Sequence, residues 1–358
     1  MYHLTLKTEQ IMMAARFNST ISKNVTIAKK FVLDKHFNGL PKRTDIKLVE
    51  ETLPQIQNGE FLTEAVYLSV DPYIRAYQPL TKLGRVMMCL QIAKVIESNS
   101  EKFPIGTYVV GDYGWRTHTI SCEKSFGEKV MGWKLPPFGT LPLSVGLGML
   151  GLTGNTAYFG LLDICQPKAN ETVVVSGAAG AVGSHVGQIA KIKGCKVIGI
   201  AGSDDKGKWL TNELGFDHFI NYKEPNILEK LKQFAPNKVD CYFDNVGGEL
   251  SSNVMRCMNK FGRISVCGAI TAYNSNPADL PKATLVQGMM AIQQLKMEGF
   301  IVTTFFPRWM EGIEQNLKWL QEGKLKYRET ITDGFENTFQ AFVDMLQGKN
   351  FGKALVKV

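Results

Sequence analysis

A glycine-rich turn between an apolar strand and an amphipathic helix constrains the fold of this chain more than any other feature. Residues 176–183 read Ser-Gly-Ala-Ala-Gly-Ala-Val-Gly, and they separate the apolar run 172–175 from a helical pattern over 181–193. Glycine lets a backbone turn sharply and approach a pyrophosphate, while the helix N-terminus offers unpaired N–H groups. Gly183 is expected to allow close packing of helix on strand. In this context the turn predicts a Rossmann dinucleotide site; a turn without ligand is the alternative.

The residues that follow repeat the same alternation of strand and helix. The helix over 181–193 presents one apolar face, Gly194 is placed to end it, and a strand over 196–201 follows at once. Further patterns predict a strand over 239–244, a helix over 249–259 and a strand over 263–267. The apolar face of the first helix consists of Val182, Val186, Ile189 and Ala190. This order indicates a parallel sheet covered by helices.

The first third of the chain has a different pattern. Apolar and polar residues alternate from 58 to 70, and shorter alternating runs follow, which predicts β structure. With 358 residues, 44% of them hydrophobic, the chain is long enough for two cores, so we expect two domains. The last fifty residues offer two helices and a strand over 353–358, which is expected to rejoin the first domain.

Charge and cysteine content narrow the functional class. The net charge is +8, but 41 basic residues are scattered among 33 acidic ones, which argues against a nucleic-acid partner and suits an anionic cofactor. The seven widely spaced cysteines indicate reduced, buried thiols, and no apolar run is long enough to span a membrane. A cytoplasmic location is expected. Residues 1–26 are interpreted as a flexible extension, with a mitochondrial presequence as the alternative.

The end of the second strand leaves the choice of cofactor open. An acid there would bind the ribose of NAD, and a cation would accept the extra phosphate of NADP. The segment Gly202-Ser203-Asp204-Asp205-Lys206 offers both, so spacing alone does not decide.

Five segments carry a resemblance to one family. They are Val70-Asp71-Pro72-Tyr73-Ile74-Arg75, Thr156-Ala157-Tyr158-Phe159-Gly160, Ala178-Ala179-Gly180-Ala181-Val182-Gly183, Tyr242-Phe243-Asp244-Asn245-Val246-Gly247-Gly248 and Cys267-Gly268-Ala269-Ile270. From about Lys29 to its C-terminus the chain resembles the prostaglandin reductases, also called leukotriene 12-hydroxydehydrogenases, 15-oxoprostaglandin 13-reductases or alkenal reductases. These belong to the zinc-free medium-chain dehydrogenases/reductases.

The resemblance implies an architecture and a cofactor. It implies a GroES-like β-barrel domain formed by residues 27–150 and 308–358, a Rossmann domain over 151–307, and a homodimer. The implied cofactor is NADPH, with Lys206 at its 2′-phosphate, Gly202 leaving room for that phosphate, and Asn221 and Tyr222 nearby. Together with the turn, the predicted cofactor-binding residues are Gly180, Ala181, Val182, Gly183, Gly202, Lys206, Tyr222, Asn245, Cys267, Gly268, Ala269, Ile270, Tyr273, Phe300, Ile301, Val302 and Asn350. Residues 300–302 are expected to form a strand.

Zinc ligands are missing from the sequence. No C-x-x-C cluster is present, and His118 and Cys122 lack the spaced partners of a catalytic site. We therefore expect no metal, and we expect all five histidines (His3, His36, His118, His185 and His218) on the surface or in loops. Oxidation of a plain alcohol is difficult without a Lewis acid, whereas an enone is its own electron sink.

These considerations predict reduction of the carbon–carbon double bond of α,β-unsaturated ketones or aldehydes. Hydride from NADPH would reach the β-carbon, an enolate would develop, and hydrogen bonds would stabilise it. Tyr73 is the candidate hydrogen-bond donor, with closure of a turn as its alternative role. Arg75 is either an anchor for an acidic lipid tail or part of an ion pair. The alternatives are an NADPH quinone reductase and a noncatalytic NADPH-binding protein.

The sequence also departs from the family pattern. Ile292 stands where a tyrosine is usual, and Cys89 stands where glycine is usual. Thr153 and Asn155 alter the approach to Thr156. We expect these changes to reshape the substrate pocket, so the substrate is left open among eicosanoids, alkenals and other enones.

Overall fold

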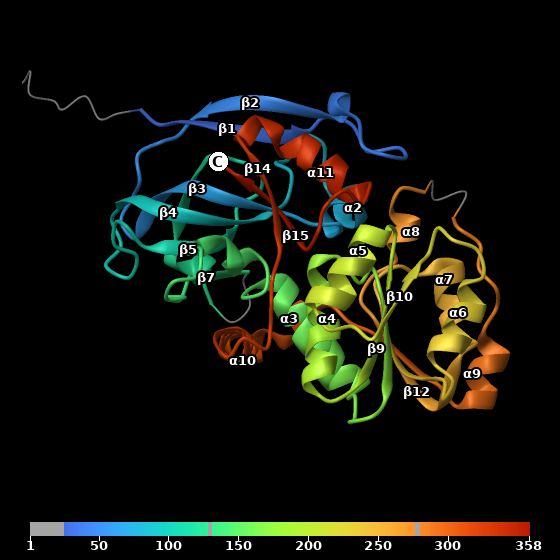
Figure 1. Cartoon of the computed structure of the whole chain (residues 1–358). Coiled ribbons are helices and arrows are strands. Elements are labelled where there is room, and N and C mark those ends of the chain that lie inside the picture. The colour runs from blue at the N-terminus through green and yellow to red at the C-terminus, as the bar shows by residue number, and fades with distance from the viewer. Residues whose placement is uncertain (1–24, 128–130, 276–279) are drawn as a thin grey trace, which may run out of the picture.

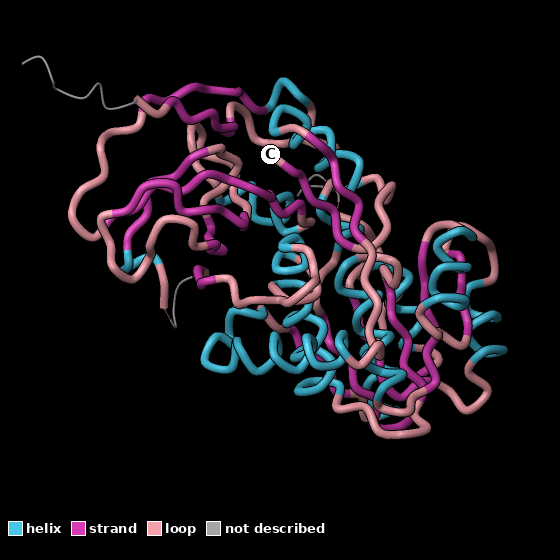
Figure 2. The backbone as a smooth tube through the Cα atoms, turned by 60° about the vertical axis from the view of Figure 1, so that its left-hand side comes forward, coloured by secondary structure: helices cyan, strands magenta, loops and turns pink. Residues whose placement is uncertain are grey.

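Two sheets with different hydrogen-bonding patterns organise the chain in its computed structural model (Figure 1). The structure describes residues 25–127, 131–275 and 280–358. The extension predicted for residues 1–26 thus lies almost wholly outside the described residues. Figure 2 shows the strands gathered into two groups, with most of the helices around the second group.

The first sheet joins the N-terminal third to the C-terminal end of the chain. Its order is β14-β15-β3-β4-β5-β7, with β6 paired to β3, and β1 and β2 form a separate antiparallel pair. The strands are β1 (Ile27–Leu33), β2 (Ile46–Thr52), β3 (Glu60–Val70), β4 (Leu90–Ser98), β5 (Tyr108–Asp112), β6 (His118–Cys122), β7 (Gly132–Lys134), β14 (Glu329–Asp333) and β15 (Lys353–Lys357). Because β15 runs antiparallel to β3, with Ala354 opposite Val70, the predicted return of the tail to the first domain is confirmed.

The second sheet is parallel and has the strand order of a dinucleotide-binding fold. It runs β10-β9-β8-β11-β12-β13, which is the order 3-2-1-4-5-6 counted from β8. The strands are β8 (Thr172–Ser176), β9 (Lys196–Ala201), β10 (His218–Asn221), β11 (Val239–Asp244), β12 (Met258–Val266) and β13 (Lys296–Gly299). The predicted α/β class, a doubly wound parallel sheet beside a β domain completed by the C-terminal segment, is confirmed.

Helices cover both faces of the parallel sheet. Helix α4 (Ala181–Ile192) packs Val186, Ile189 and Ala190 into the apolar cluster on one face, and Gly194 ends it with a φ of 80°. On the other face, Leu231 and Val254 belong to a second cluster. The remaining α-helices are α2 (Tyr73–Tyr77), α3 (Leu152–Phe159), α5 (Asp204–Lys208), α6 (Ile227–Phe234), α7 (Gly248–Met255), α8 (Ile270–Tyr273), α9 (Gln287–Gln293), α10 (Trp309–Gln321) and α11 (Thr338–Leu346).

Two predicted elements are wrong at their ends. The helix predicted over 249–259 ends at Met255, because the chain turns at Cys257, whose carbonyl accepts from the Val239 N–H, and then enters β12. The strand predicted over 300–302 ends at Gly299, and a short 3-10 helix follows over Val302–Arg308. There the chain leaves the sheet, so Phe300, Ile301 and Val302 reach the space between the sheets instead of extending β13.

A further apolar cluster joins the first sheet to helices α3 and α10. Leu90 and Ile92 of β4 share it with Leu152 of α3 and with Trp309 and Ile313 of α10. Helix α10 also contributes Trp319 to the cluster of the parallel sheet. Since one helix serves both cores, the domain limits at 150/151 and 307/308 stay predictions.

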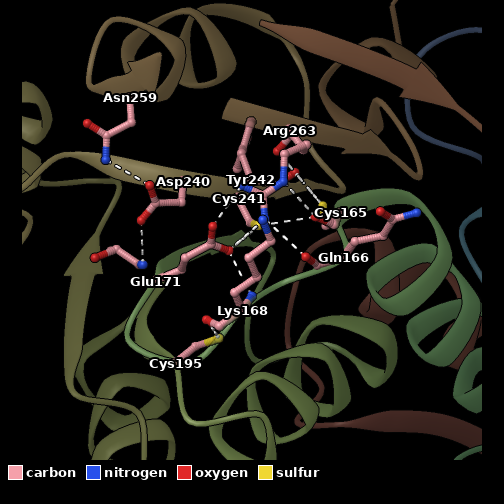
Figure 3. Close-up of polar contacts among 11 residues, drawn as sticks. Cys165, Gln166, Lys168, Glu171, Cys195, Asp240, Cys241, Tyr242, Asn259 and Arg263 are labelled. Atoms are coloured by element: carbon pink, nitrogen blue, oxygen red, sulfur yellow. Dashed lines mark hydrogen bonds and ion pairs between the residues drawn. The ribbon is translucent and has the colours of Figure 1, made fainter. Parts of the chain in front are cut away.

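Arg263 clamps the amino end of the parallel sheet (Figure 3). Its guanidinium donates to both carboxylate oxygens of Glu171, at 3.0 and 2.6 Å, and to the carbonyls of Cys165 and Gln166, at 2.8 and 3.1 Å. The pKa of Glu171 is lowered overall. Burial alone would raise it, but the hydrogen bonds from Arg263 and from the Lys168 N–H have the larger combined effect. The carboxylate therefore stays ionised and paired at neutral pH.

The histidine prediction is wrong at one position. His185 lies on α4 and is 1% exposed, and burial lowers its pKa to about 4. His118 and His218 are half-buried, and His3 lies outside the described residues. The expectation for cysteines holds better, because five of the seven are buried and all are free, while Cys122 and Cys267 are half-buried.

Candidate active site

A cavity of about 1190 Å³ lies between the two sheets, at the carboxyl edge of the parallel sheet. Open α/β sheets bind ligands at this edge, where the strand order reverses, which here is between β8 and β11. Tyr73 and all the predicted cofactor-binding residues except Ala269 line this cavity, and Ala269 lines a small adjoining hollow. Asn221, which was expected near the cofactor, does not line it. The structure therefore gathers residues that are far apart in the sequence, from Tyr73 to Asn350.

The glycine-rich turn forms one wall of the cavity. Gly177 has a φ of 61°, and a Cβ on Gly183 would lie 2.4 Å from the Gly177 carbonyl oxygen, so the close packing expected of Gly183 is present. Gly180 precedes the first turn of α4, which contains no acidic side chain. The amino end of α4 thus presents free N–H groups and its positive dipole to the cavity, as an anionic phosphate requires.

The C-terminal tail contacts this turn from the other domain. The Gly352 N–H donates to the Ala179 carbonyl at 2.9 Å, and Gly180 and Gly352 form a β-bridge. A Cβ at Gly352 would stand 1.9 Å from the Arg328 carbonyl oxygen, so only glycine fits there. Asn350, just before it, lines the cavity and donates to the Gly352 carbonyl at 2.9 Å.

Two lysines stand at the end of β9 and β10. Lys206 and Lys223 both line the cavity, and burial together with the Lys223 charge lowers the pKa of Lys206. The Lys206 ammonium donates to the Gly348 carbonyl at 2.7 Å. Asp204 does not line the cavity, and its carboxylate accepts from the Asn221 amide at 3.0 Å. We call the region of Gly180, Gly202, Lys206, Tyr222 and Lys223 the cofactor end.

Sequence reasoning missed Lys223. It follows Tyr222 directly, but its position beside Lys206 depends on the pairing of β10 with β9, in which Asn221 stands opposite Ala201. A charge count over the turn after the third strand would have been the available signal.

Internal hydrogen bonds hold the loop after β11. The buried Asp244 carboxylate accepts from Tyr242, Ser251 and Ser176 and from the N–H groups of Val246 and Gly247. The Asn245 amide donates to the Ser176 carbonyl at 2.7 Å. The Ala269 N–H donates to the Tyr273 hydroxyl at 3.2 Å. These bonds fix the loop beside the glycine-rich turn.

Tyr73 lines the other half of the cavity. It begins α2 directly after Asp71-Pro72, and burial first, then the charge of Asp71, raises the pKa of its hydroxyl well above the usual value. The phenol is therefore protonated at neutral pH and can donate a hydrogen bond. Asp71 itself pairs with the buried Lys353 at 3.0 Å and accepts from Ser69.

Asp112, the last residue of β5, also lines this half and was not predicted. Burial raises the pKa of its carboxyl, and the Cys89 N–H opposes that shift. In the sequence Asp112 is a single acid between a strand and a turn, so no local pattern marks it. We call the region of Asp71, Tyr73, Met88, Asp112, Met131 and Thr153 the substrate end.

The departures from the family pattern fall in different places. Thr153 lines the cavity, whereas Cys89 and Asn155 are fully buried without lining it. Ile292 is 72% exposed on α9. Arg75 is buried, donates to Asn274 at 3.0 Å and does not line the cavity. It forms no ion pair with a described residue, so neither of its expected roles is confirmed.

The described residues contain no group of three or more His, Cys, Asp or Glu side chains that could hold a metal ion. Within the same residues, every helix is too short or too polar to cross a lipid bilayer.

Comparison with known proteins places this site in a family. Residues 29–129 match a family described as the N-terminal domain of oxidoreductase, and residues 181–321 match one described as zinc-binding dehydrogenase. Prostaglandin reductase 1 of Bos taurus is 48% identical over 92% of this chain and 99% of its own length. The NADPH-dependent curcumin reductase of Escherichia coli is 36% identical, over 92% and 96%.

A solved structure shows the same fold with a nucleotide bound. CurA from Vibrio vulnificus in complex with NADPH superposes with a TM-score of 0.84 and 38% identity, covering 92% of this chain and 99% of that one. The similarity therefore extends over both domains and the cavity between them. The chain belongs to the prostaglandin reductase family of the medium-chain dehydrogenases/reductases.

Proposed function

We propose that this protein is an NADPH-dependent reductase of the carbon–carbon double bond in α,β-unsaturated ketones and aldehydes. One observation carries the proposal: a single cavity contains a phosphate-binding turn, two lysines and, at its other end, a protonated phenol. The activities for which the related prostaglandin and curcumin reductases are named support it.

The cofactor end fits NADPH. Gly183 lets the start of α4 pack closely on the Gly177 carbonyl, which brings the helix N-terminus to the cavity where a pyrophosphate would bind. A Cβ on Gly202 would stand 2.9 Å from the Tyr222 ring, so glycine leaves space there. Lys206 and Lys223 are proposed to bind the 2′-phosphate, because they are the lysines that line this end of the cavity. The Asp204 carboxylate accepts from Asn221 and does not line the cavity. When bound there, NADPH supplies the hydride that the double bond accepts.

Tyr73 is proposed to act on the substrate. Its proton, retained because burial raises the phenol pKa, is available to the carbonyl oxygen on which negative charge develops. The ion pair with Lys353 neutralises the Asp71 carboxylate and fixes the residue that stands two positions before the start of α2. Phe300 and Leu152, which line the cavity, keep this region apolar and strengthen such a hydrogen bond.

We also propose a homodimer in the cytoplasm. The dimer is supported by β13, which ends the parallel sheet with no further strand beside it among the described residues, and by Met297, which is 39% exposed there. Sedimentation at the mass of one chain would exclude the dimer.

The first experiment is a substrate panel with NADPH consumption followed at 340 nm. The panel holds a 2-alkenal, a conjugated ketone, a 15-oxoprostaglandin and a quinone, and a simple alcohol is offered with NADP. We expect turnover on the enal or the enones. A strong preference for the quinone would make the protein a quinone reductase, and tight NADPH binding without turnover would make it a noncatalytic binding protein.

Replacing Lys206 tests the cofactor. Lys206→Ala removes a charged hydrogen bond to the 2′-phosphate, so the KM for NADPH should rise about tenfold to a hundredfold while that for NADH changes little. Lys208→Ala is the matched control, since Lys208 lies on the same helix, pairs with Asp205 and does not line the cavity. An equal rise in the KM values for NADPH and NADH would show that Lys206 does not recognise the 2′-phosphate.

Replacing Tyr73 tests the proton donor. Tyr73→Phe keeps the ring and removes the hydroxyl, and kcat/KM should fall on the order of a hundredfold with NADPH affinity retained. Tyr327→Phe, at an exposed tyrosine outside the cavity, should have no such effect. If Tyr73→Phe keeps the wild-type kcat/KM, the hydroxyl has no role in the reaction and Tyr73 serves only to close the turn.

A further inference from the structure

Asp112 stands where several strands of the first sheet end together. Asp71 follows β3, Cys89 precedes β4, and Asp112 closes β5 opposite Leu90. The Asp112 N–H donates to the Met131 carbonyl at 3.2 Å, so Met131 lies beside it. Asp112 and Met131 both line the cavity, which places the Asp112 carboxylate in the substrate end, near Tyr73.

The two aspartates of the substrate end differ in their partners. Asp71 is neutralised by Lys353, whose ammonium lies 3.0 Å from Oδ1 and donates also to the carbonyls of Val70 and Ala354. Asp112 has no ion pair with any described residue, and no cation is among the groups that shift its pKa. Lys353 therefore neutralises Asp71, whereas the Asp112 carboxylate remains an uncompensated negative charge at the substrate end.

The cations of the cavity lie elsewhere. In the described part of its lining the positively charged side chains are Lys206 and Lys223, both at the cofactor end. The 2′-phosphate of the proposed cofactor would engage them. A carboxylate on the substrate would then lie near Asp112 without a cation to pair with. Two negative charges in a largely apolar cavity repel each other strongly.

We propose that Asp112 is a specificity-determining residue that directs this enzyme toward uncharged enones and enals and against those that carry a carboxylate. The inference rests on the proposed double-bond reduction and names the substrate class of the same site. Its consequence is that fatty-acid-derived enones are poor substrates as free acids and better ones as esters.

A matched substrate pair tests this. One compound is a straight-chain conjugated enone with a terminal carboxylate, and the other is its methyl ester; kcat/KM is measured for both with saturating NADPH. We expect the wild type to favour the ester by about tenfold or more. Asp112→Asn should reduce that preference to about threefold or less, whereas Asp112→Glu, which keeps the charge, should retain most of it.

Glu101→Gln is the control, because Glu101 is an exposed acid of the same sheet domain that does not line the cavity, and it should leave the preference unchanged. NADPH affinity of each variant, measured by fluorescence, shows that the cofactor end is intact. Equal wild-type rates on acid and ester, or an unchanged preference in Asp112→Asn, would overturn the role of Asp112 while leaving the reductase standing. Failure of the wild type to reduce either compound would instead overturn the proposed function, and this inference with it.

Discussion

The pairing of β15 with β3 is the constraint on which the site depends. Within three consecutive residues the chain contacts the glycine-rich turn through Gly352, neutralises Asp71 through Lys353 and enters the sheet through Ala354, opposite Val70. Each contact joins segments separated by more than 170 residues. A shift of one residue in this register would move every β15 side chain to the other face of the sheet, so the buried Lys353 could no longer reach Asp71.

The cavity that results is divided electrostatically along its length. At one end the helix α4 dipole and the charges of Lys206 and Lys223 favour an anion, while at the other end Asp112 contributes an uncompensated negative charge. Between them the lining is largely apolar. A dinucleotide bound along this axis would have its charged half in the positive region and its reactive ring near Tyr73, so the charge distribution alone gives the ligand a direction.

The sequence predicted best where local pattern and local geometry coincide. The turn at 176–183, the helix after it and the strand over 196–201 lie where periodicity places them, because each is determined by neighbours in the chain. Asp112 and Lys223 were missed because their importance arises from strand pairing, which no local window contains. The roles of the cofactor-binding residues rested on family resemblance. They stay predictions, although the cavity brings all but Ala269 together.

His185 shows a different kind of miss, one that periodicity could have avoided. It lies four residues before Ile189, so the helical repeat that buries Ile189 buries the imidazole too. His185 therefore belongs to the buried side of α4.

The two ends of the parallel sheet are built for opposite purposes. At the amino end, Arg263 makes four hydrogen bonds that tie β12 to Glu171 and to the segment at 165–166, and the side chains of Arg263 and Glu171 are each about one-fifth exposed. At the carboxyl end, glycines replace side chains, and backbone N–H groups of the α4 start remain without acidic partners. Since unpaired N–H groups cost stability unless a ligand or water accepts from them, the carboxyl edge gains most from a bound anion. The hydrogen bonds of Arg263 at the amino edge offset the cost of these unpaired N–H groups, because they hold strand order and register where no ligand needs to enter.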